Sequence, residues 1–188
     1  MSLTRGEREF ACEYLGFTKK WLLDSVEGLS QQAMEVRPGP HEWSIAQCIE
    51  HLALEGDFAW KTLRDLLRQP PTPEKQQEVR RNIKQMIVIM TDRSRKGQAM
   101  PFLQPVCKIP DSGAALERFV SQRDLLIDYV KRTEDELKNR HAFHQTVGTI
   151  NLYQFLILEG AHSARHVLQI EEIKGATTDR RPAGRWWL

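Results

Sequence analysis

Several chemical features are scarce in this chain of 188 residues. It has three cysteines, Cys12, Cys48 and Cys107, which are odd in number and form no CxxC pair. So few and so widely spaced cysteines indicate reduced thiols rather than a disulfide framework, and they predict a cytoplasmic protein. The formal net charge is only +2, so strong electrostatic attraction to nucleic acid or to an anionic membrane is not expected.

Long hydrophobic runs and common enzyme signatures are also missing. No stretch approaches the roughly 18 consecutive apolar residues of a membrane span. The N-terminal segment is charged from Arg5 onward and lacks the apolar centre of a signal peptide. The patterns GxGxxG, GxxxxGK[ST], GxSxG and HExxH do not occur, which removes the usual signals of nucleotide binding, serine hydrolysis and zincin proteolysis.

What the chain does contain is helical periodicity. Apolar residues recur at three- and four-residue spacing in four segments, at about 4–28, 45–68, 114–138 and 152–174. Capping-box pairs open the first two segments, Thr4 with Glu7 and Ser44 with Gln47, and Gly175 suits the end of the last. Four long amphipathic helices without a good strand pattern predict an all-α four-helix bundle.

The connection between the second and third helical segments is unusually long. Its apolar residues at 79, 83, 86, 87 and 90 have helical spacing and predict a short extra helix. Residues 97–110 hold three prolines and are expected to form an extended, ordered loop. Residues 1–176 are expected to form a single domain, followed by a tail, 177–188, that is either disordered or docked through Trp186 and Trp187.

Three histidines carry the clearest chemical signal. His162 and His166 are four residues apart in the last helical segment, so their side chains lie on one helix face. His51, in the second helical segment, can supply a third nitrogen from a facing helix. Three neutral imidazoles suit zinc, nickel, iron or copper and leave a fourth position for water or substrate. The spacing favours a working metal site, although a single helix histidine is more often a packed core residue.

Carboxylates and a thiol accompany these histidines. Glu55 lies one turn after His51, and Glu159 lies three residues before His162. Either glutamate could orient an imidazole or act as a general base, and a solvated helix glutamate is the competing interpretation for both. Cys48 could supply a thiolate ligand one turn before His51, but a buried bystander is the preferred interpretation.

The remaining histidines and a basic cluster give weaker signals. His41, His141 and His144 fall in predicted connecting segments and are expected to be surface or capping residues. The basic cluster consists of Arg80, Arg81, Lys84, Arg93, Arg95 and Lys96. It is either a solvated face or a site for an anionic substrate near the crossover loop.

Two motifs resemble the DinB/YfiT-like superfamily of bacterial four-helix-bundle proteins. WSIAQCIEHL, at 43–52, is similar to that family's tryptophan-serine start of helix two followed by histidine-leucine. HSARHVLQI, at 162–170, is similar to its pattern of two histidines four residues apart. The resemblance covers about residues 5–175, including FLQP and ALERFVSQRDLLIDYV between the motifs.

This resemblance implies a fold, a site and a function. The fold is an up-down-down-up four-helix bundle whose long crossover lies between helices two and three, often assembled as a homodimer. The site is a divalent transition metal (zinc, nickel or iron) on His51, His162 and His166. Characterised relatives include metal-dependent transferases that act on low-molecular-weight thiols such as bacillithiol and mycothiol.

We therefore expect a metal-dependent enzyme with a small-molecule substrate. Thiol S-transfer is the first expectation and metal-dependent hydrolysis the second, whereas a non-catalytic binding module and a scaffold with merely structural histidines are the alternatives. Two neighbouring apolar stripes on the first helix, together with the apolar end Trp186-Trp187-Leu188, predict a homodimer, with a monomer as the alternative.

Overall fold

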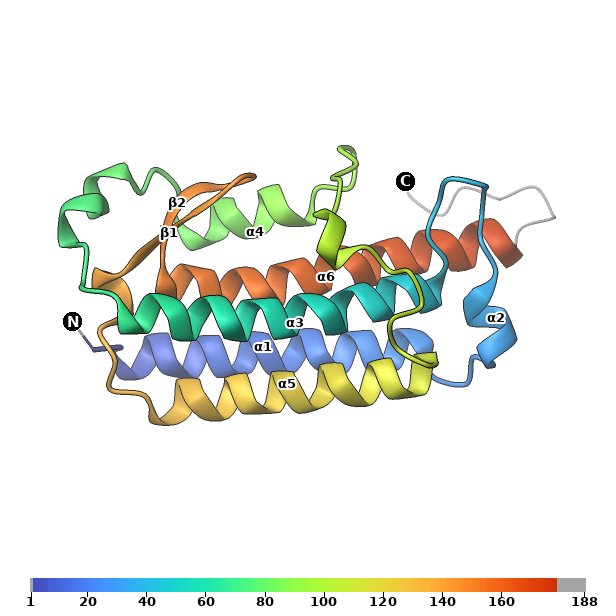
Figure 1. Cartoon of the computed structure of the whole chain (residues 1–188), viewed down its shortest axis with the longest axis horizontal. Helices are drawn as coiled ribbons and strands as arrows, with labels where there is room; N and C mark the ends of the chain where they lie inside the picture. Colours follow the sequence, from blue (N-terminus) through green and yellow to red (C-terminus); the bar gives the residue numbers. More distant parts are fainter. Residues whose placement is uncertain (1, 179–188) are drawn as a thin grey trace, which may run out of the picture.

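The computed structural model describes residues 2–178, and within them four long helices form a bundle (Figure 1). These helices are α1 (Arg5–Val26), α3 (Ile45–Arg68), α5 (Ser112–Arg132) and α6 (Leu152–Thr178). α1 and α6 run in one direction, and α3 and α5 run in the other (Figure 1). Because α1 and α3 each contact both α5 and α6, the helices close a ring in the order α1–α5–α3–α6. This is the up-down-down-up bundle that the resemblance implied.

Side-chain caps fix where the first two bundle helices begin. The Glu7 amide donates to Thr4 Oγ1 at 3.2 Å, and the Thr4 amide donates to the Glu7 carboxylate at 2.8 Å. Ser44 and Gln47 form the same reciprocal pair at the start of α3. Both predicted capping boxes are thus confirmed, and α3 begins and ends where the periodicity predicted.

The other two bundle helices end differently from the prediction. α5 stops at Arg132 rather than near residue 138, because Arg8 donates to the carbonyls of Val130 and Thr133 and satisfies the helix end there. α6 continues through Gly175 to Thr178. A glycine permits a left-handed helix end but does not require it, and Gly175 does not adopt a positive φ. Most of the predicted tail, including Trp186 and Trp187, lies outside the described residues.

The crossover between α3 and α5 carries short helical pieces. They are the 3-10 turn η1 (Pro73–Glu78), helix α4 (Ile83–Thr91) and the 3-10 turn η2 (Pro101–Leu103). α4 is the predicted extra helix, and it begins at Ile83 because Asn82 caps it. It packs against α6 on the outside of the bundle (Figure 1). None of the helices in residues 2–178 combines the length and apolarity that crossing a bilayer requires.

Small elements that the sequence did not predict also appear. A short helix, α2 (Gln31–Glu35), precedes α3, and an antiparallel hairpin of β1 (His141–His144) and β2 (Gly148–Asn151) precedes α6. Gly148, at φ +80°, adopts the backbone conformation that the hairpin turn requires. The expectation of no strands was therefore wrong for this segment, since four-residue strands give too few alternations to recognise.

His141 differs from its expected place at the surface. It is buried, with Nδ1 3.1 Å from Thr72 Oγ1 and Nε2 3.2 Å from Gln76 Oε1. Both ring nitrogens are thus used to join the hairpin to the crossover, which makes this histidine structural.

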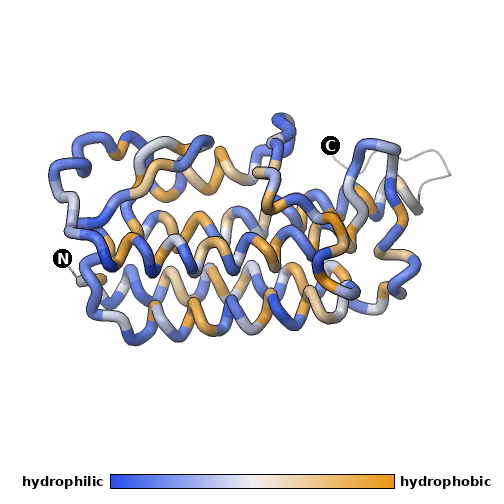
Figure 2. Tube along the Cα trace, in the orientation of Figure 1, coloured by the Kyte–Doolittle hydropathy of each residue, from blue (hydrophilic) through white to orange (hydrophobic). Residues whose placement is uncertain are grey.

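Hydrophobic residues recur along every bundle helix, as Figure 2 shows, and the buried ones form two clusters. One includes Leu15, Leu63, Val130 and Ile157, and the other includes Leu22, Ile49, Phe119 and Val167. Each bundle helix also contributes polar side chains to the middle of the bundle. We call this group the polar layer, and its members are Thr18, Glu55, Gln122, Arg123, Glu159 and Ser163. The core is therefore interrupted by polar groups in the middle of the bundle.

Candidate metal centre

The three predicted histidines come together between α3 and α6. His162 Nε2 lies 3.0 Å from His166 Nε2 and 3.4 Å from His51 Nε2, and the three nitrogens all lie within 4.8 Å of one another. Two imidazoles that bind one ion at about 2.1 Å in tetrahedral geometry have nitrogens roughly 3.4 Å apart. The two separations that involve His162 are therefore close to those of nitrogens that share one transition-metal ion.

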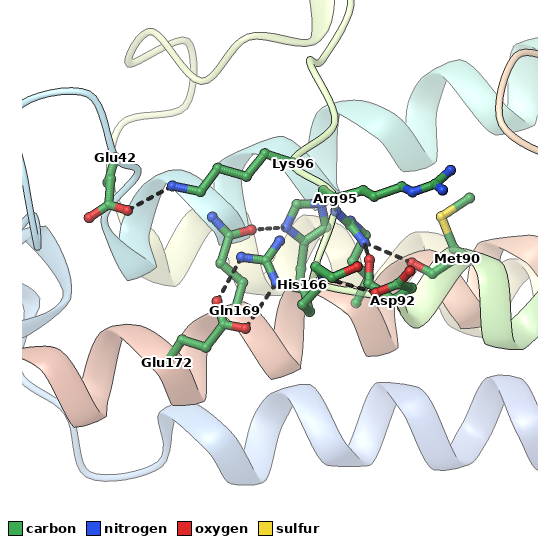
Figure 3. A network of polar contacts seen from close by, with 11 residues as sticks. Glu42, Met90, Asp92, Arg95, Lys96, His166, Gln169 and Glu172 are labelled. Atoms are coloured by element: carbon green, nitrogen blue, oxygen red, sulfur yellow. Dashed lines mark hydrogen bonds and ion pairs between the residues drawn. The ribbon is translucent and has the colours of Figure 1, made fainter. Parts of the chain in front are cut away.

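Hydrogen-bond acceptors face the outer nitrogens of two of these rings. His51 Nδ1 lies 2.9 Å from the carbonyl oxygen of Leu103, in the crossover loop. His166 Nδ1 lies 3.0 Å from Gln169 Oε1, one turn further along α6 (Figure 3). An acceptor at Nδ1 keeps the proton there, which leaves the Nε2 lone pair free to bind a metal.

A pair of carboxyl groups from the polar layer orients the third ring. Glu55 Oε2 lies 3.7 Å from His162 Nδ1, and the side chains of Glu55 and Glu159 are hydrogen-bonded to each other. Burial and the neighbouring Glu55 raise the pKa of Glu159 well above its usual value. Burial has the largest effect on Glu55 and acts to raise its pKa, but the combined effects of His162, Glu159 and His51 outweigh burial and lower that pKa to about 2. Glu55 is therefore the ionised partner of His162, and Glu159 holds the proton between the two carboxyl groups.

Two of the imidazoles, those of His51 and His166, are held in the neutral form. Burial, followed by the adjacent His162, lowers the pKa of His51 to about 4. Burial and the two other imidazoles lower the pKa of His166 well below its ordinary value. Neutral imidazole is the form that binds a metal. At neutral pH a metal could therefore bind these two rings without displacing a proton from either.

Arg123 is the cation of the polar layer. It is 5% exposed, and its Nη2 donates to the Glu159 carbonyl at 3.1 Å and to Ser163 Oγ at 2.8 Å. Burial lowers the pKa of its guanidinium, and the neighbouring Glu159 and Glu55 act in the opposite direction. Its Nη1 and Gln122 Oε1 have no hydrogen-bond partner among the described residues. Both residues line a cavity of about 20 Å³, which has room for about one water molecule.

Trp43 lies beside the histidines, a position that the sequence did not predict. Its ring centroid lies 5.0 Å from that of His51 and 6.0 Å from that of His166, nearly parallel to the latter at 14°. The sequence suggested only a hydrophobic contact before the cap of α3. The structure places the aromatic ring of Trp43 against two of the three imidazoles.

Glu50 is a second residue that the sequence analysis missed. It is 6% exposed, and its carboxylate accepts three consecutive backbone amides of the crossover loop. The donors are the amides of Cys107 at 3.2 Å, Lys108 at 2.5 Å and Ile109 at 3.4 Å. Cys107 has a φ of +59°, which is uncommon for a residue other than glycine. Two adjacent residues of α3, Glu50 and His51, thus hold the same loop.

Cys48 lies apart from the imidazole cluster. It is fully buried in the apolar core, and burial raises the pKa of its thiol to about 12. A thiol held so firmly in its protonated form behaves as a small hydrophobic side chain, in keeping with the preferred interpretation.

Much of the basic cluster is engaged with other parts of the chain (Figure 3). Arg93 pairs with Glu172 of α6 at 2.8 Å, and Lys96 pairs with Glu42 at 3.1 Å. From α6, Arg165 donates to the carbonyls of Met90, Asp92 and Arg95. These contacts fasten the loop after α4 beside His166, so an anionic substrate would have to compete with existing carboxylate partners.

Two proteins of Bacillus subtilis are similar to this chain, one in sequence and one in fold. YuaE, an uncharacterized protein of Bacillus subtilis (strain 168), is 25% identical over 152 residues, which span 80% of this chain and 89% of YuaE. The structure is similar to that of YfiT from Bacillus subtilis, described as a probable metal-dependent hydrolase with an unusual four-helix bundle topology. The TM-score is 0.58 at 16% identity, over 95% of this chain and 91% of YfiT. Residues 15–170 match the DinB superfamily, and the chain therefore belongs to that superfamily.

Proposed function

We propose that His51, His162 and His166 bind one divalent transition-metal ion through Nε2 and that the protein is a metal-dependent enzyme acting on a small molecule. The observation that carries this proposal is the convergence of the three Nε2 atoms while every Nδ1 faces an acceptor. Structural zinc sites are usually completed by four protein ligands, whereas three leave a position for substrate. A bound ion would lower the pKa of a thiol or water molecule that reaches it and so supply a nucleophile near neutral pH.

Thiol transfer is the reaction that we favour. The carboxyl groups of Glu55 and Glu159 are hydrogen-bonded to each other, and Glu55 also faces His162, so neither is free to act as a general base. A thiol loses its proton when it binds a metal and needs no separate base. In this proposal the thiol releases that proton to solvent, its sulfur forms a bond to an electrophilic carbon, and the electron pair of the broken bond leaves with the departing group. Glu55 and Glu159 then serve to orient His162.

Hydrolysis is the second candidate. It is supported by the description of YfiT, which shares the fold, as a probable metal-dependent hydrolase. The two candidates would use the same metal and the same three histidines, and they differ in the nucleophile and in the bond that it attacks.

Metal analysis of protein purified without an affinity tag tests the site. We expect close to one equivalent of zinc, nickel or iron, and we expect His162→Ala to lose stoichiometric occupancy because only two nitrogens remain. His41→Ala, which removes an exposed histidine, is the matched control and should leave the metal content unchanged. Full occupancy in His162→Ala would show that the triad is assigned wrongly.

Turnover assays of the metal-loaded protein distinguish the two reactions. Bacillithiol, mycothiol or glutathione would each be supplied with a fluorogenic electrophile, alongside a panel of esters and amides without thiol. Thiol-dependent product that disappears on chelation and returns with metal supports transfer, and ester or amide cleavage with the same metal dependence supports hydrolysis. Absence of both would contradict the enzyme proposal.

A further inference from the structure

A small cavity lies inside the bundle, among the residues of the polar layer. Its walls belong to α3, α5 and α6, and its volume of about 20 Å³ has room for one water molecule. The polar residues of its wall are Glu55, Gln122, Arg123, Glu159 and Ser163. A cavity of this size holds water only where polar groups can bond to it, so the hydrogen bonding of these side chains decides what the cavity contains.

The guanidinium of Arg123 is held in place at this cavity. Its Nη2 donates to the Glu159 carbonyl at 3.1 Å and to Ser163 Oγ at 2.8 Å, and its Cζ lies 5.2 Å from the centre of the Phe119 ring. Arg123 is 5% exposed, and its Nη1 has no hydrogen-bond partner among residues 2–178. An unbonded N–H of a buried charged group is costly, so Nη1 requires an acceptor that the described part of the chain does not supply.

Gln122 presents the complementary group to the same cavity. Its Nε2 donates to the Ala53 carbonyl at 3.1 Å and to the Asp57 carboxylate, which fixes the side on which the amide oxygen lies. That oxygen, Oε1, lies against Gly56, where a Cβ atom would overlap it, and Gly56 also lines the cavity. Gln122 is 9% exposed, and within the described residues no group donates to Oε1. The wall thus offers one unbonded donor and one unbonded acceptor.

We infer that one water molecule occupies this cavity and bridges the two residues, accepting a hydrogen bond from Arg123 Nη1 and donating one to Gln122 Oε1. Water fits both groups because it accepts and donates at once. A chloride or another small anion could accept from Nη1 but could not donate to Oε1, and a metal cation would be repelled by the guanidinium. Binding of this water does not require a metal at the three-histidine centre.

This water completes a chain of hydrogen bonds across three helices. Gln122 joins α5 to the Ala53 carbonyl of α3, the water joins Gln122 to Arg123, and Arg123 joins α5 to Ser163 of α6. Ser163 directly follows His162 in the sequence. The polar layer therefore holds the helix that carries two of the candidate ligands, and the water supplies the hydrogen bonds that the side chains alone do not make.

A crystal structure of the unaltered protein, at a resolution that shows ordered water, tests this site directly. We expect one density peak in the cavity, within about 3.2 Å of both Arg123 Nη1 and Gln122 Oε1. Absence of a peak there would overturn the inference. A second crystal soaked in sodium bromide identifies the occupant: an anomalous bromide signal at the same position would mean an anion site instead, and a peak without that signal supports water.

Oxygen-17 relaxation dispersion of the solvent provides the test in solution, because it counts the water molecules that tumble with the protein. Ala59 lines the cavity, and the methyl groups that Ala59→Val adds would occupy its space. We expect this variant to hold one long-lived water molecule fewer than the unaltered protein. Ala176→Val, which adds the same groups at an exposed position of α6, is the matched control and should leave the count unchanged. An equal count in Ala59→Val and the unaltered protein would contradict the proposed water site.

Discussion

The carboxylate of Glu50 connects the candidate centre to the crossover loop. It accepts three backbone amides of that loop, and the Leu103 carbonyl of the same loop faces His51 Nδ1. In Glu50→Gln an amide nitrogen replaces one of the two accepting oxygens, so buried N–H donors would lose their partner. We expect the free energy of unfolding to fall by about 1–3 kcal/mol, measured by urea denaturation. Metal affinity should fall by about tenfold because the acceptor of His51 is no longer held.

Glu42→Gln is the matched control for Glu50. Glu42 pairs with Lys96, but the two side chains are 47% and 80% exposed, so the control should cost less than about 1 kcal/mol. Equal losses of stability in the two variants would mean that the loop is not held by Glu50.

At the same scale, the ligands of the candidate site could be predicted and most of their partners could not. His162 and His166 share a helix face, which sequence spacing reveals directly. The acceptor of His51 is a backbone carbonyl 52 residues away, and every residue type has such a carbonyl. Glu50 gives no signal for a similar reason, since the amides that it accepts lie 57 to 59 residues along the chain.

Among the elements, α1 and α6 approach closely at Gly160. A Cβ atom at this position would lie 2.7 Å from Tyr14 Cε1, and the Tyr14 ring already stacks on Phe10 at a centroid distance of 5.9 Å. We expect Gly160→Ala to lower the free energy of unfolding by about 1–2 kcal/mol, because crowding outweighs the better helix propensity of alanine. Chemical denaturation followed by circular dichroism would measure this loss.

We expect Gly16→Ala, on helix α1, to raise the free energy of unfolding. A Cβ atom there meets nothing within 4 Å, so only the propensity of alanine acts and stability should rise by up to about 1 kcal/mol. If both substitutions stabilised the protein alike, the close contact between α1 and α6 would be refuted.

Helix starts were easier to predict than helix ends or short strands. The capping pairs of α1 and α3 lie within four residues of sequence, so the physical cause of each start can be read locally. The end of α5 depends on Arg8, more than 120 residues away. The hairpin likewise depends on distant partners, since Arg81 anchors Val147 and Gln76 contacts His141.

For the whole molecule, periodicity predicted a bundle but not the order of its helices. Four amphipathic segments are compatible with several ring orders, and the long crossover only indicates that α3 and α5 need not be antiparallel neighbours. The resemblance to the DinB/YfiT-like superfamily supplied the up-down-down-up order, which the structure confirms. The parallel pairs α1 with α6 and α3 with α5 place the polar layer across all four helices beside the imidazole cluster.

Exposed aromatic side chains on α1 favour assembly of the protein into a dimer. Phe10 and Phe17, seven residues apart on that helix, are 40% and 59% exposed, and the Phe17 ring lies 5.7 Å from that of Trp21. Twofold dimers commonly bury such an apolar surface, so we predict a homodimer through α1. Light scattering should give twice the mass of one chain for the unaltered protein and the mass of one chain for Phe17→Glu.

Phe143→Glu places the same charge on a hairpin residue that is 78% exposed and should leave the dimer intact. Phe17→Glu should still unfold cooperatively, because its side chain is mostly outside the core and a charge there costs little in the monomer. A single-chain mass for the unaltered protein at micromolar concentration would exclude the dimer. If the dimer forms, deletion of residues 177–188 tests whether the end of the chain contributes to it. An unchanged dissociation constant would assign the interface to the bundle alone. Weaker association would show that the apolar end of the chain takes part in the interface.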